Sequence, residues 1–99
     1  MSFLVTHPEA LATAASQLSL IGSGMAAQNA AAAAATTHLP PAAADEVSVL
    51  TARQFSTHAA TYQTVGAQAM AVHELLTAIL HASASSYAAT ETANAIAAC

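Results

Sequence analysis

The sequence predicts an all-α fold, an antiparallel two-helix hairpin that completes a four-helix bundle with a partner chain, and three observations support this. First, 30 of the 99 residues are alanine, which has the highest helix propensity, and only 3 are glycine. Second, one Pro-Pro pair, Pro40 and Pro41, separates two alanine-rich halves, and proline interrupts helices. Third, the apolar residues of the second half cover a wider arc than one neighbouring helix can bury.

The positions of the helices follow from the Pro-Pro pair. A chain of 99 residues is short enough to form one domain, residues 1–99. We expect helix one at about residues 7–36, a turn at about 37–41 and helix two at about 42–84, followed by a C-terminal tail at about 85–99. Because the connection is short, the two helices should lie antiparallel.

Both predicted helix starts carry a local signal. Thr6, Pro8 and Glu9 fit a capping box, with Thr6 as the N-cap, Glu9 at the third helical position and proline in the first turn. Asp45 and Glu46 place negative charge near the positive end of the second helix dipole. The sequence therefore predicts a cap for helix one and a favourable charge near the start of helix two.

One face of helix one repeats every seven residues. Leu11, Leu18 and Met25 have this spacing, and Ala15 and Gly22 lie beside them. Because Ala15 and Gly22 are small, we expect another backbone to approach closely at this face.

Helix two is more apolar than a hairpin requires. Its large apolar residues span about 160° of arc, whereas a surface helix needs an apolar stripe of about 100°. Each large side chain left in water forgoes roughly 1.5–3 kcal/mol of burial free energy. We therefore expect either a partner or self-association, and we expect ten residues to form the contacts: Leu11, Leu18, Ile21, Met25, Phe55, Tyr62, Val65, Val72, Leu76 and Leu80.

Composition and charge exclude several classes of function. The formal net charge is −4, and Arg53 is the single Lys or Arg, so the chain cannot neutralise nucleic-acid phosphates or bind membranes through a basic patch. No stretch of about 18–20 apolar residues is present, so we expect no transmembrane segment. The first residues lack the basic start and apolar run of a Sec signal peptide. If the chain is exported, it uses another route.

The polar residues do not form a catalytic or metal-binding motif. His73 and Glu74 begin like a zinc-protease motif, but the next histidine, His81, is not four residues after His73. Nucleophile elbows, acid–base carboxylate pairs and cysteine pairs are absent from the sequence. We expect no metal, no cofactor and no enzymatic activity, and we interpret His58 and His73 as hydrogen-bonded interface histidines.

Four segments carry a family resemblance. They are Met1-Ser2-Phe3 with Pro8-Glu9, then Pro41-Ala42-Ala43-Ala44-Asp45-Glu46-Val47-Ser48, then Gln54-Phe55 with His58 and Tyr62-Gln63, and lastly Tyr87-Ala88-Ala89-Thr90-Glu91. Together they resemble the mycobacterial PE family, which is named for the Pro-Glu pair. The last segment matches the Y-x-x-x-[DE] signal of type VII (ESX) secretion substrates. No extension follows the tail, so we expect a short member with the PE domain alone.

The resemblance implies a partner and a route of export. The partner would be a PPE protein, whose two long helices pack against the PE hairpin in a four-helix bundle. The folded heterodimer would be exported by an ESX system, with Tyr87 and Glu91 in the secretion signal of the tail. A cytosolic chaperone would bind the PPE subunit. The protein would then be secreted or held at the cell surface or envelope, and it would act at the cell surface or on the host.

Two other readings of the sequence stay open. In one, the PE/PPE pair sits in the outer envelope and helps small solutes to cross it. In the other, the chain is an amphipathic helical protein that self-associates and needs no partner. The wide apolar arc of helix two agrees with all three readings.

Overall fold

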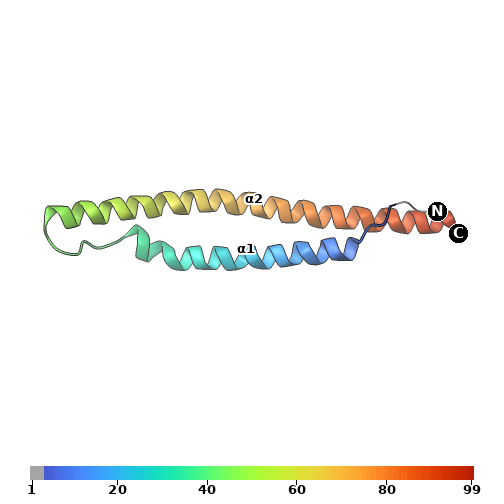
Figure 1. Ribbon diagram of the computed structural model, residues 1–99, viewed down its shortest axis with the longest axis horizontal. Helices are drawn as coiled ribbons and strands as arrows, with labels where there is room; N and C mark the ends of the chain where they lie inside the picture. The colour runs from blue at the N-terminus through green and yellow to red at the C-terminus, as the bar shows by residue number, and fades with distance from the viewer. Residues whose placement is uncertain (1–3) are drawn as a thin grey trace. The chain divides into compact units, whose positions relative to one another are not determined.

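The computed structural model describes residues 4–99, so Met1, Ser2 and Phe3 of the family resemblance lie outside the described residues. Two helices account for all the regular secondary structure of this range, α1 (Pro8–Thr37) and α2 (Glu46–Ala98), as Figure 1 shows. The all-α prediction is therefore confirmed.

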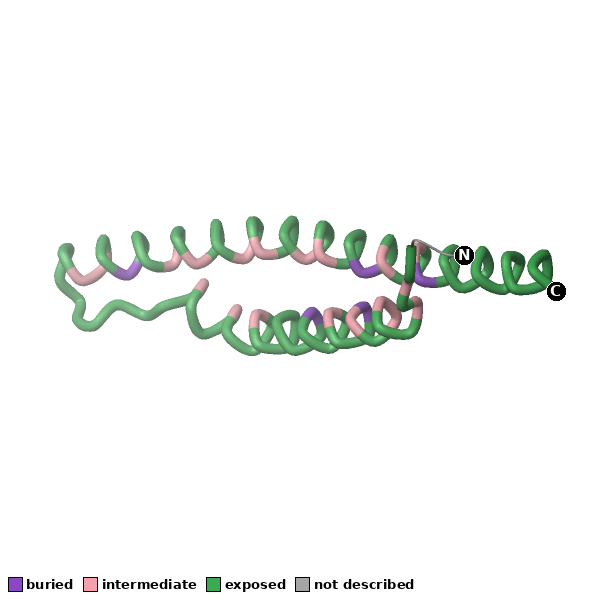
Figure 2. Tube along the Cα trace, turned by 45° about the vertical axis from the view of Figure 1, so that its right-hand side comes forward, coloured by how far each residue is buried: buried purple, intermediate pink, exposed green. Residues whose placement is uncertain are grey.

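The described chain divides into two compact units. One contains residues 4–22 and His73–Cys99, and the other contains Ser23–Val72. In each unit a segment of α1 packs along an oppositely directed segment of α2 (Figure 1), which confirms the predicted hairpin. In both units the buried and half-buried residues lie where the two helices face each other (Figure 2).

The N-cap of helix α1 lies one residue later than predicted. Pro8 is the first helical residue, so His7 occupies the N-cap position, and its carbonyl oxygen accepts a hydrogen bond of 3.2 Å from the N–H of Leu11. The predicted capping box, which needs Thr6 as the N-cap and Glu9 at the third helical position, is therefore wrong by one residue. Pro8 takes the first helical position, where a missing N–H costs nothing.

Helix α2 begins at Glu46, later than the predicted residue 42, because Asp45 caps it. The N–H of Ser48 donates to Asp45 Oδ2 at 3.0 Å, and Ser48 Oγ donates to Oδ1 at 2.7 Å. The hydroxyl bond, and then the backbone bond, hold the pKa of the Asp45 carboxyl below its ordinary value of 3.8, because both stabilise the carboxylate.

Helix α2 also ends later than predicted. It runs to Ala98, so the expected tail at about 85–99 is helical almost throughout. Ser83, Ser85 and Ser86 do not end the helix, because alanines surround them and neither glycine nor proline follows Gly66. Tyr87 and Glu91 are consequently held on a helix.

The buried side of α2 recurs at alternating spacings of three and four residues, the pattern of a helix packed along one neighbour. We call these residues the seam of α2: Val49, Ala52, Ser56, Ala59, Gln63, Gly66, Met70, His73, Thr77, Leu80 and Ala84. Most of them are small or polar, so only a few large apolar side chains, such as Met70 and Leu80, lie between the two helices.

The buried residues of α1 at this contact are also small. Ala15 is completely buried and Gly22 is buried, as the sequence predicted for a close backbone approach. Among the described residues, the only other buried apolar side chains are Ala52 and Ala84, and no large side chain is fully buried. The hairpin therefore lacks a substantial hydrophobic core of its own.

Hydrogen bonds join the helices in each unit. In the first unit, Nε2 of His73 lies 2.6 Å from the carbonyl oxygen of Leu18. In the second unit, Nε2 of Gln63 donates to the carbonyl oxygen of Asn29 at 3.0 Å, and the Tyr62 hydroxyl lies 3.4 Å from Oδ1 of the same asparagine. Polar contacts thus provide part of the stabilisation between the helices that apolar packing provides in a larger core.

Candidate functional site

Exposed apolar residues of α2 gather mainly on one side of the helix, and Leu75 lies off that side. Six of them come directly before a seam residue, as Phe55 does before Ser56 and Val72 before His73. Because successive residues are about 100° apart, all six lie on the same flank of the seam. We call these residues the apolar flank: Phe55, Tyr62, Val65, Val72, Leu76 and Ile79.

The opposite flank has a different composition. Arg53, Glu74 and His81 each come directly after a seam residue, and alanine and threonine fill most of the equivalent positions. Leu50 is the one large apolar side chain there. The two sides of α2 beside the seam are therefore distinct, one apolar and one polar.

Helix α1 extends the apolar flank in the first unit. Ile21 is 59% exposed and comes directly before the buried Gly22. In an antiparallel helix pair, residues that precede the contact positions of both helices lie on the same side. Ile21 therefore lies on the side of Leu76 and Ile79, and the apolar surface of this unit includes both helices.

The ten predicted contact residues fall into two groups. Seven are exposed: Ile21, Met25, Phe55, Tyr62, Val65, Val72 and Leu76. Leu11, Leu18 and Leu80 are half-buried in the hairpin itself, so the chain already covers part of each of them. The set also omitted Ile79, which is 54% exposed on the apolar flank and lies within the same predicted arc.

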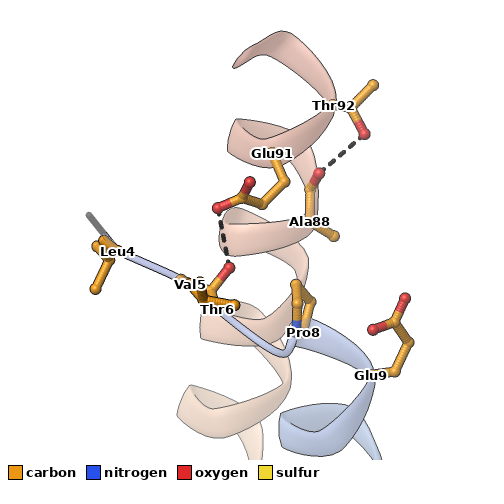
Figure 3. Close-up of a pocket in the computed structure, with 8 residues that line it drawn as sticks. All are labelled: Leu4, Val5, Thr6, Pro8, Glu9, Ala88, Glu91 and Thr92. Atoms are coloured by element: carbon orange, nitrogen blue, oxygen red, sulfur yellow. Dashed lines mark hydrogen bonds between the residues drawn. The ribbon is translucent and has the colours of Figure 1, made fainter. Parts of the chain in front are cut away.

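A second feature lies in the first unit, where the segment before α1 meets the last part of α2. Figure 3 shows the hydroxyl of Thr6 donating to Oε1 of Glu91, at a distance of 3.0 Å. Pro8 and Glu9 line the same hollow as Glu91. The structure thus brings together the Pro-Glu pair and the last residue of the Y-x-x-x-E segment.

Tyr87 lies beside the same segment. Together with Thr6, His7, Ala10 and Leu11 it lines a second hollow of the first unit. Tyr87 is 46% exposed and Glu91 is exposed, so both can be reached from solvent.

The titratable residues form no metal site in the part of the chain that the structure describes, because no three His, Cys, Asp or Glu side chains gather there. His73 is hydrogen-bonded as predicted, although its bond lies within the hairpin, whereas His58 is exposed. Cys99 is an exposed free thiol. Across residues 4–99, neither helix is long and apolar enough to cross a bilayer.

The described residues thus form a two-helix hairpin with almost no buried core and an exposed apolar flank. The family model of the PE family matches residues 4–94, and the chain belongs to this family. It is 59% identical to PE family protein PE13 of Mycobacterium tuberculosis over 98 residues, which cover 99% of each chain.

Longer relatives match over only part of their own length. PE family protein PE8 of M. tuberculosis is 53% identical over 98 residues, 99% of this chain and 36% of PE8. PE-PGRS family protein PE_PGRS1 of the same species is 52% identical over 95 residues, 96% of this chain and 19% of that protein. The chain thus spans a minor part of these two proteins, and none of the three names describes a reaction.

Proposed function

We propose that the protein is a non-enzymatic subunit that forms an obligate heterodimer with a PPE protein and is exported with it by a type VII (ESX) secretion system. The observation that carries the proposal is the apolar flank, which the hairpin exposes while its own seam is built mostly from small and polar residues.

The apolar flank is energetically significant for a chain of this size. Burying one large apolar side chain contributes about 1.5–3 kcal/mol. Small domains are stable by only about 5–15 kcal/mol in total. Six such residues line the flank and are each 52–68% exposed, so covering them with a partner contributes to the free energy of the complex an amount comparable with the stability of a small domain.

The two flanks of α2 indicate how a partner docks. A partner that contributes two long helices covers the apolar flank and completes a four-helix bundle, with interhelical packing typical of such bundles. The flank that carries Arg53, Glu74 and His81 stays in water, where charged side chains are best solvated.

The proposal of export rests on the Y-x-x-x-E segment. Tyr87 and Glu91 are four residues apart on α2, share one face and are accessible to solvent. In this proposal they belong to the signal that the ESX machinery reads, while a cytosolic chaperone binds the PPE subunit. The pair is then secreted or held at the cell surface or envelope.

The first test is circular dichroism with a thermal melt, on the chain expressed alone and on the chain co-expressed with a PPE protein. We expect an aggregating or weakly helical chain alone and a cooperative melt for the pair. A stable, monodisperse and helical chain without any partner would overturn the obligate heterodimer and favour self-association through the apolar flank.

A second test separates export from pairing. Tyr87→Ala should leave the intracellular heterodimer intact and stop its appearance in the culture medium. Ala60→Ser, a mild change at an exposed position on the opposite flank, is the control and should preserve both. If Tyr87→Ala abolished pairing, Tyr87 would be a packing residue and the assignment of the secretion signal would be wrong.

A further inference from the structure

Thr6 occupies a special place in the first unit. It lines the hollow that contains Glu91 and also the hollow that contains Tyr87. Thr6 is half-buried, whereas the neighbouring Val5 and His7 are exposed. One residue of the segment before α1 therefore borders both hollows, the one that Glu91 lines and the one that Tyr87 lines.

The position of Tyr87 and Glu91 on α2 explains this arrangement. The seam ends at Ala84, and the same alternation of three and four residues continues to Tyr87 and Glu91. Both side chains thus point to the side of α2 along which α1 packs. Because α1 begins only at Pro8, residues 4–7 lie beside the part of α2 that carries Tyr87 and Glu91.

The Thr6–Glu91 hydrogen bond restrains a charged group that is otherwise mobile. A hydroxyl that donates to a carboxylate forms a charge-assisted bond, which is stronger than a bond between neutral groups. A solvent-exposed glutamate has many rotamers, and a bond of 3.0 Å to Thr6 favours the few that bring its carboxylate to the segment before α1.

We infer that Thr6 is a positioning residue for the secretion signal. The machinery then reads a surface formed by residues 4–9 together with Tyr87 and Glu91, and not the Y-x-x-x-E sequence alone. This inference rests on the proposed export of the protein. It assigns to the start of the chain a part in recognition, through the hydroxyl that holds the Glu91 carboxylate.

The test compares three variants of the full chain, each co-expressed with a PPE protein in a mycobacterium. Thr6→Val keeps the shape of the side chain and removes the hydroxyl, and Thr6→Ser restores the hydroxyl. Thr92→Val is the matched control, because Thr92 lines the same hollow but its hydroxyl donates to Ala88 of its own helix at 2.9 Å. The readouts are the secreted fraction, the intracellular heterodimer and its melting temperature.

We expect Thr6→Val to lower the secreted fraction roughly three- to tenfold, the range that loss of one solvent-exposed hydrogen bond of ordinary strength produces. Thr6→Ser and Thr92→Val should be secreted like the wild type, and all three should pair normally. Normal secretion of Thr6→Val would overturn the inference. So would a defect that Thr6→Ser does not repair, an equal defect in Thr92→Val, or loss of pairing in Thr6→Val.

Tyr87→Ala, assayed in parallel, distinguishes this inference from the proposed function. If Tyr87→Ala is retained while Thr6→Val is secreted, the export signal stands and the role of Thr6 is refuted. If Tyr87→Ala is secreted like the wild type, the proposed signal itself is refuted, and the role of Thr6 with it.

Discussion

Nε2 of His73 donates a hydrogen bond of 2.6 Å to the main-chain carbonyl oxygen of Leu18, across the contact between α1 and α2. A carbonyl oxygen only accepts, so this nitrogen carries the proton. The oxygen has two lone pairs and can accept a helical N–H at the same time. Gly22, four residues after Leu18, is buried and has no side chain to shield the oxygen.

Removing this imidazole should destabilise the hairpin. His73→Ala leaves a half-buried contact without its hydrogen bond, and we expect the free energy of unfolding of the purified heterodimer to fall by about 1–2 kcal/mol. Urea titration followed by circular dichroism measures the change. His58→Ala, at an exposed position, serves as the control and should change stability little. Equal losses in the two variants would show that the bond contributes nothing specific.

The three glycines should respond differently to a side chain. A Cβ at Gly24 would meet no atom within 4 Å, and one at Gly66 would lie 3.6 Å from Nδ2 of Asn29, an ordinary contact. Because glycine is unfavourable inside helices, Gly24→Ala and Gly66→Ala should each stabilise the protein by about 0.5–1 kcal/mol. Thermal melts of the heterodimer measure this effect.

Gly22 supplies the contrast within that series. It is buried where the helices meet, so Gly22→Val should overpack the contact and lower stability by roughly 1–3 kcal/mol. A neutral Gly22→Val would mean that α1 and α2 can separate locally without cost. A destabilising Gly24→Ala in the heterodimer, but not in the chain alone, would place Gly24 against the partner.

Local sequence signals predicted the hairpin well because they depend on nearby residues. Alanine content and the Pro-Pro pair predict two helices, and the small residues Ala15 and Gly22 predict their close approach. The cap of α1 was misplaced by one residue, because Thr6 and His7 both precede Pro8 and the pattern does not decide between them.

The periodicity of the sequence does not tell which residues of the apolar arc face α1 and which face solvent. It places Leu80 and Phe55 on one broad face, but which part faces α1 depends on the three-dimensional contact, and only the structure separates the seam from the apolar flank. The Thr6–Glu91 bond was also beyond the sequence, since 85 positions separate the two residues and neither belongs to a spacing motif that includes the other.

The cap at Asp45 predicts a dependence of stability on pH. Hydrogen bonds from Ser48 hold the pKa of this carboxyl below 3.8 in the folded state, so the ionised form favours folding. Its contribution is therefore fully present above the unfolded pKa of about 4 and is lost as the pH falls through the lower folded value. Asp45→Asn keeps a capping oxygen and cannot ionise.

Thermal melts of wild type and Asp45→Asn at several pH values between 7 and 3 test this. We expect the wild type to be the more stable at neutral pH and the difference to shrink below about pH 4. Asp45→Ala, which loses the capping oxygen as well, should be the least stable of the three at neutral pH. A difference between wild type and Asp45→Asn that stays constant with pH would contradict the role of the charge.

The contrast between the flanks of α2 gives the sharpest test of the interface. Phe55 is 61% exposed on the apolar flank, and Ala60 is exposed on the opposite flank of the same helix. Phe55→Asp buries an unpaired charge when the partner docks, which costs several kcal/mol, so we expect the affinity for the PPE protein to fall at least about 100-fold. Ala60→Asp introduces the same charge on the side that stays in water and should pair normally. Co-purification of tagged PPE protein with each variant measures both. Stoichiometric pairing of Phe55→Asp, or loss of pairing in Ala60→Asp alone, would show that the partner binds elsewhere on the hairpin.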